Sequence, residues 1–337
     1  MRNRAGSMAI CGLAGMVLCA APLSAQEIIP KSGALVAIDN GQTLWIAPVN
    51  GKMQVIAVND YVIPRKDGFW RVLLPSKSWP PAVVAFPLSK SKGGTTAKRG
   101  ASTEKKDDRA GGEDQSDEKM QPQSDEVQRQ EVKFLSPAYI SIYTETEQSE
   151  GYSLLQTTER TGESMLVFSD ANLSIPEDVK MKDVKACVDP QDENADYQEY
   201  AAQRETIGIV RARGQWRYDG GISLRAYQTN CAASLVPPKS IVAQNELFPI
   251  WKEIKDVYPD AEDAFSSPNH DMLLVFYQNR LMVAPVWHGK VGKPLLRLEV
   301  EGKPVMVEWA LGKYLDVWTK QLTPYFATYT PKGKPAQ

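Results

Sequence analysis

The chain has 337 residues, 24% of them charged, and its formal net charge at pH 7 is −2. A nearly neutral chain lacks the basic field that attracts nucleic acid, so we expect no nucleic-acid partner. The length allows one large core or two domains, at about 100–200 residues per domain.

Residues 1–25 have the features of a secretion signal. Two arginines give a positive start, Met8 to Ala21 is apolar, and a small-residue cleavage site ends at Ala25. The apolar run is shorter than the roughly 20 residues of a transmembrane helix, so an uncleaved anchor is only the alternative. We expect a mature chain of residues 26–337 that is extracytoplasmic, either periplasmic or secreted, with no membrane span.

Signal removal leaves two of the four cysteines, Cys187 and Cys231. In an exported chain two thiols most simply form one disulfide, and two buried free thiols are the alternative. The bridge would close a loop of about 45 residues and contribute about 3–4 kcal/mol in the chain-entropy model.

Residues 30–88 predict an N-terminal β meander. Short apolar runs alternate with Asn-Gly and Asp-Gly pairs, which accept the positive φ angles of tight hairpin turns. The expected strands cover residues 34–38, 43–49, 53–58, 69–74 and 82–86.

Residues 89–131 differ sharply in composition, because they contain few apolar side chains and pass from a basic to an acidic half. Such a segment cannot bury enough surface to offset its ordering entropy, so we expect a disordered linker or insertion. An electrostatic tether to polymers or envelope surfaces is an alternative interpretation. Neither charge block is long or pure enough to require a partner.

The remainder divides into a middle β region, residues 132–236, and a C-terminal β meander, residues 237–330, before a loose tail at 331–337. Apolar side chains at helical spacing predict short helices near 247–257 and 313–322. The expected strands cover residues 138–145, 151–159, 165–169, 206–212, 216–218, 272–277, 280–286, 294–300 and 305–310, with a further strand beginning at 132 and another that follows Gly220-Gly221 and ends at Tyr227.

Two segments, one near each end of the chain, have similar sequences and form an internal repeat. Residues 35–52 and 273–290 each give two strands around a turn, then Ala-Pro-Val followed shortly by Gly-Lys. Repeated antiparallel meanders of three to four strands are typical of a propeller-like closed assembly, and two packed β domains are the alternative. We therefore predict a mainly β fold.

The sequence contains no motif typical of a nucleotide, zinc or nucleophilic catalytic site. Asp192, Asn194 and Asp196 repeat the first three ligand positions of a calcium loop, but Tyr197 replaces the turn glycine. We therefore interpret this run as a plain acidic loop and expect no cofactor, and a calcium site is the alternative.

Two further groups of residues are candidates for contact with a ligand. Trp287 lies beside His288-Gly289 in an expected turn, so it is the tryptophan best placed to contact a ligand. Carboxylates also gather at Asp256, Asp260, Glu262 and Asp263. Paired acids hydrolyse glycosides only when the fold sets them on opposite sides of a sugar.

These patterns favour an exported binding or scaffold module whose partner is an unidentified envelope protein or glycan. A carboxylate-dependent hydrolase acting on glycan or peptide, with calcium assistance, is the alternative. The first hypothesis predicts no pocket lined by the acids of 189–196 or 256–263, and the second predicts that these acids meet an exposed aromatic side chain. The oligomeric state is left open.

Overall fold

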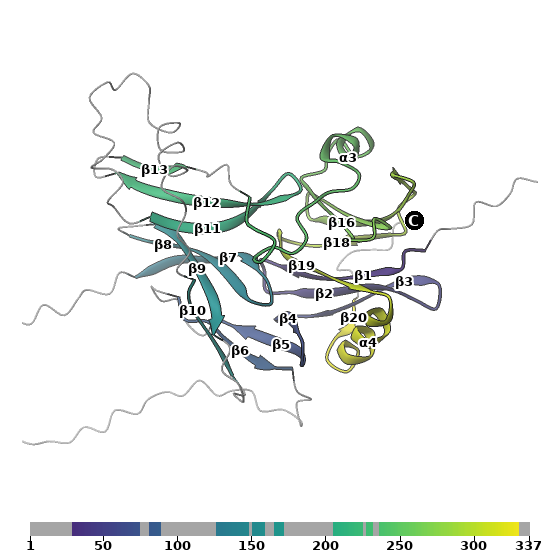
Figure 1. Cartoon of the computed structure of the whole chain (residues 1–337), viewed down its shortest axis with the longest axis horizontal. Helices are drawn as coiled ribbons and strands as arrows, with labels where there is room; N and C mark the ends of the chain where they lie inside the picture. The colour runs from purple at the N-terminus through teal and green to yellow at the C-terminus, as the bar shows by residue number, and fades with distance from the viewer. Residues whose placement is uncertain are drawn as a thin grey trace, which may run out of the picture.

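The computed structural model describes residues 29–74, 81–88, 126–147, 150–158, 165–171, 205–224, 227–231 and 236–329. Across these residues the protein is mainly β, with antiparallel sheets and two short helices (Figure 1). The predicted fold class is therefore confirmed.

A five-stranded sheet lies at the centre of the fold, and its strand β1 is buried on both faces. Its strands, in spatial order, are β19 (Pro304–Leu311), β1 (Ser32–Ile38), β2 (Thr43–Val49), β3 (Lys52–Val58) and β20 (Ala327–Thr328). In β1, Leu35 and Ala37 face one hydrophobic core, whereas Ala34, Val36 and Ile38 face a second. A strand covered on both faces needs no polar alternation, which explains the continuous apolar run in β1.

The C-terminal sheet covers one face of the central sheet. It contains β14 (Asp263–Ser266), β15 (Met272–Tyr277), β16 (Arg280–Trp287) and β17 (Lys290–Val291), with β18 (Leu296–Glu299) paired to β16. Leu274 and Leu281 share a core with Val36 and Leu44 of the central sheet. The other face packs against α3 (Trp251–Val257) through Ile254.

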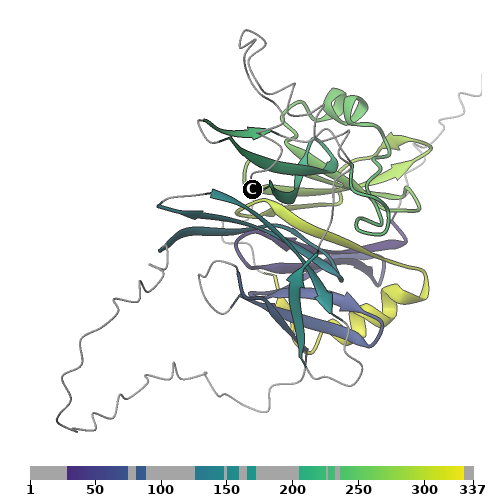
Figure 2. The same ribbon diagram turned by 60° about the vertical axis from the view of Figure 1, so that its left-hand side comes forward.

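A seven-stranded curved sheet and α4 (Lys313–Leu322) cover the opposite face (Figure 2). Trp318 of α4 packs against Trp45 and Phe69, with ring centroids 5.7 and 5.2 Å away. The strands of the curved sheet, in spatial order, are β4 (Tyr61–Arg65), β5 (Gly68–Leu73), β6 (Val84–Pro87), β10 (Leu166–Asp170), β9 (Glu150–Thr158), β8 (Tyr139–Thr146) and β7 (Val127–Leu135).

A smaller sheet contains β11 (Glu205–Ala212), β12 (Gln215–Leu224) and β13 (Tyr227–Cys231). Ile209 and Trp216 bring its first hairpin into the core between the central and C-terminal sheets. Phe134 of β7 meets Trp216 edge-on in the same core, with ring centroids 4.9 Å apart.

The internal repeat corresponds to β1–β2–β3 and β15–β16–β17. The second turn is alike in the two copies: Asn50 and Gly51 have φ angles of 52° and 73°, and His288 and Gly289 have 50° and 74°. The first two strands of each copy contribute to one shared core, so the copies pack face to face.

Some element boundaries differ from expectation. β7 begins at Val127 rather than near Val132, so the segment predicted as disordered to residue 131 ends in a strand. Its charged side chains pair with one another, because Glu131 forms salt bridges with both Arg129 and Lys133. Helix α3 begins only at Trp251, since Pro249 disfavours helix at the residue before it and Ile250 is extended.

Candidate functional site

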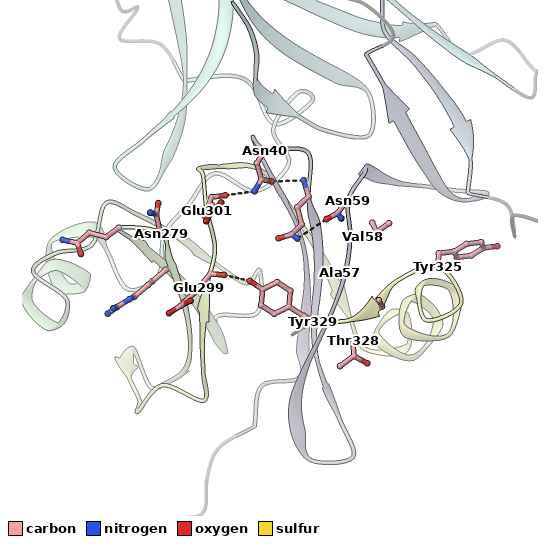
Figure 3. A pocket seen from close by; sticks show the side chains of 14 residues that line it. Asn40, Ala57, Val58, Asn59, Asn279, Glu299, Glu301, Tyr325, Thr328 and Tyr329 are labelled. Atoms are coloured by element: carbon pink, nitrogen blue, oxygen red, sulfur yellow. Dashed lines mark hydrogen bonds between the residues drawn. The ribbon is translucent and has the colours of Figure 1, made fainter. Parts of the chain in front are cut away.

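A cleft of about 880 Å³ opens where turns of the central and C-terminal sheets meet (Figure 3). We call it the turn cleft. Its lining residues come from the β1–β2, β3–β4 and β15–β16 turns, the end of β18 and the segment after α4. Typical ligand pockets measure about 300–1,000 Å³, so the turn cleft is large enough for a ligand of drug size or more.

One wall carries the side-chain amides of Asn40, Gln42 and Asn59. Asn40 donates from Nδ2 to the carbonyl of Glu301 at 2.8 Å, and its Oδ1 accepts the backbone N–H of Gln42 at 2.9 Å. Gln42 then donates from Nε2 to Asn59 Oδ1 at 3.3 Å. Each side-chain amide offers two donor hydrogens and two acceptor lone pairs. These contacts use only some of them, so the three amides keep donors and acceptors for a ligand.

The opposite wall is the two-residue turn between β15 and β16. Gln278 and Asn279 both have positive φ angles, 39° and 25°, and the turn is closed by the pairing of Tyr277 with Arg280. Asn accepts this backbone region better than most residues. Gln278, Asn279 and Arg280 are exposed, which places two more amides and a guanidinium at the cleft.

Two carboxylates lie on the same side as this turn. Glu299 ends β18, where it pairs in register with Arg280, and Glu301 follows two residues later. Both are exposed, and neither carboxylate forms a salt bridge or side-chain hydrogen bond with the part of the chain that the structure describes. They are therefore free to accept hydrogen bonds from a ligand.

The C-terminal segment completes the cleft. β20 pairs with β3 at two positions, and the Tyr329 N–H then donates to the Val55 carbonyl at 3.1 Å. Figure 3 shows Tyr329 reaching from this strand towards Glu299, whose carbonyl accepts its hydroxyl. Burial, aided by the negative charges of Glu299 and Glu301, raises the pKa of Tyr329. Tyr329 thus remains a protonated donor that joins the two sheets across the cleft.

The turn cleft therefore combines amides, carboxylates, a guanidinium and two tyrosines, Tyr325 and Tyr329. Groups of this kind exchange hydrogen bonds with hydroxyl-rich molecules, and tyrosine rings add apolar contact next to a polar tip. Glu299 and Glu301 belong to one chain segment on one wall. Hydrolysis of a glycoside instead needs carboxyl groups on opposite sides of the sugar.

The calcium candidates Asp192, Asn194 and Asp196 lie outside the described residues, as does Cys187. Cys231 is the last residue of β13. Because Cys187 is not among the described residues, the predicted disulfide stays a prediction. In the part of the chain that the structure describes, no three histidine, cysteine or acidic side chains are grouped to hold a metal ion. The same part contains no helix long and apolar enough to cross a membrane.

Trp287 is 58% exposed at the start of the β16–β17 turn, and its ring meets that of His288 with centroids 4.6 Å apart. Its predicted exposure agrees with the structure. It does not line the turn cleft, however, so any ligand it contacts would lie elsewhere.

The carboxylates of 256–263 do not form a common site. Asp256, Asp260 and Glu262 are exposed and absent from the turn cleft. Asp263 is buried and accepts hydrogen bonds from Arg211 Nε at 3.0 Å and from the Gly214 N–H at 2.7 Å. Burial raises the pKa of Asp263, and the positive charge of Arg211 opposes that rise. Through its hydrogen bonds to Arg211 and Gly214, Asp263 holds β14 against the β11–β12 hairpin.

Glu308 of β19 is a partly buried acid. It pairs in register with Leu35 and lies between Met306 and Ala310, which belong to the core between the central and curved sheets. No described side chain forms an ion pair or hydrogen bond with its carboxyl. Burial alone raises the pKa of Glu308 to about 7. It does not line the turn cleft, so we assign it no role there.

The residues of the turn cleft were not identified from sequence, although Asn40 and Asn279 occur in the turns of the two repeat copies. Amides in turns are common, and only the face-to-face packing of the copies brings these together. No family model matches the chain, and no curated protein or solved structure shows significant similarity to it. Function is therefore inferred from the turn cleft.

Proposed function

We propose that the protein is an exported binding module whose ligand site is the turn cleft, and that the ligand is a hydroxyl-rich molecule such as an envelope glycan. The observation that carries this proposal is the convergence of amides from two separate turns, Asn40 with Gln42 and Gln278 with Asn279, on one open cleft. Carbohydrates present many donors and acceptors at once, and paired amides can satisfy both.

The arrangement of the acids favours binding over hydrolysis. Glu299 and Glu301 stand on one wall, which suits hydrogen bonding to one edge of a sugar but not attack from its two sides. The secretion signal predicted at residues 1–25 supports a ligand outside the cytoplasm.

The test is calorimetric titration of mature chain, residues 26–337, with neutral oligosaccharides of two to six units. Gln42→Ala combined with Asn59→Ala removes ligand contacts without altering a buried side chain, and we expect at least a severalfold loss of affinity. The matched control is Gln54→Ala, an exposed amide of β3 outside the cleft.

Absence of binding by the unaltered chain across the series would refute the proposal. Equal affinity in the double variant and the unaltered chain would place the ligand elsewhere. Release of new reducing ends during the titration would instead support the hydrolase alternative.

A further inference from the structure

The charges of the turn cleft are not balanced. It is lined by the carboxylates of Glu299 and Glu301 and by the guanidinium of Arg280, so one negative charge is in excess. Arg280 stands opposite Glu299 in the β16–β18 register, which leaves Glu301 further from this cation. The backbone of Glu301 is held by the other wall, because the Asn40 side chain donates a hydrogen bond to the backbone carbonyl of Glu301.

A second observation indicates that the electrostatic field is also negative at Tyr329, another residue that lines the cleft. After burial, the causes that raise the pKa of Tyr329 are the charges of Glu299 and Glu301. An acidic ligand in this position would meet the same repulsion, whereas a cationic ligand would be attracted.

We propose that the turn cleft selects glycans that carry free amino groups over otherwise identical N-acetylated or acidic glycans, an inference that rests on the function proposed above. An ammonium group has three donors and no acceptor, and a carboxylate is only an acceptor, so the two are complementary. Hydrogen bonds between charged partners are shorter and roughly twice as strong as neutral ones. The amides recognise ring hydroxyls, and Glu301 recognises the amino group.

The experiment compares two soluble tetrasaccharides of one backbone, glucosamine and N-acetylglucosamine, titrated into the full mature chain at low salt. A single exposed ion pair accounts for about a two- to fivefold preference for the amine, which should shrink as salt screens it. Glu301→Gln should abolish that preference by lowering affinity for the amine oligomer more than affinity for the N-acetylated oligomer. Arg280→Gln should increase the preference, because it removes the competing cation.

The matched control is Glu262→Gln, which neutralises an exposed carboxylate outside the cleft and should leave both affinities unchanged. Equal affinity for the two oligomers, or a preference that survives Glu301→Gln, would overturn the amine selectivity and leave the proposed function standing. Tighter binding of a galacturonate tetramer than of the glucosamine tetramer would also overturn it. Binding of none of these oligomers would overturn both proposals.

Discussion

The partly buried carboxyl of Glu308 should make the protein less stable as pH rises through neutrality. Its pKa is about 7 in the folded chain, against an ordinary value of 4.5. The folded state therefore holds this proton more tightly than the unfolded state does. The resulting stability is fully present below about pH 4.5 and is lost as pH rises through about 7. At 1.36 kcal/mol for each pKa unit, the loss amounts to about 3 kcal/mol.

Glu308→Gln isolates this effect, because glutamine has the shape of the protonated acid and does not titrate. We expect the variant to match the unaltered chain near pH 4.5 and to be more stable by about 3 kcal/mol at pH 8. Urea denaturation of both proteins at several pH values measures the difference, and other titrating groups cancel in it. A stability difference that stays constant between pH 4.5 and pH 8 would refute the reasoning.

Three further changes test the fold. Asp263→Ala leaves Arg211 charged and buried, and it should lower the free energy of unfolding by about 3–5 kcal/mol, measured by urea denaturation. Trp45→Ala should cost about 3–5 kcal/mol, and a double-mutant cycle with Trp318→Ala should give a coupling of about 0.5–1.5 kcal/mol. Reducing the predicted disulfide should cost about 3–4 kcal/mol, and free thiols in mass spectrometry of the unreduced mature chain would contradict its existence.

Much of the strand order along the chain could be predicted from local signals. The Asn50-Gly51 turn adopts the positive φ angles that this pair favours, and the helix at Lys313–Leu322 has the predicted bounds. β4 was missed because Tyr61–Arg65 contains Pro64 and follows β3 after two residues. β20 was missed because a two-residue strand has no periodicity, and it exists through its pairing with β3.

The layers of the fold depend on contacts that local patterns do not encode. Leu35 and Val36 are equally apolar, yet they face different cores. The alternation of faces follows from strand geometry, but the cover over the face of Val36 comes from residues more than 200 positions away in the chain, such as Leu274. Burial of charged residues is also hard to predict from sequence. Arg211 and Asp263 are residue types typical of a protein surface, but here they are buried as an ion pair.

The turn cleft shows why the site was harder to predict than the fold. Asn40 and Glu301 are 261 positions apart and are joined by one hydrogen bond. That bond forms because the copies at residues 35–52 and 273–290 pack face to face, which brings the β1–β2 turn to the β15–β16 turn. A repeat can be read from one sequence, but face-to-face and side-by-side copies share the same pattern of apolar residues. Only the first arrangement opposes the two turns, so in this protein the packing of the copies creates the turn cleft.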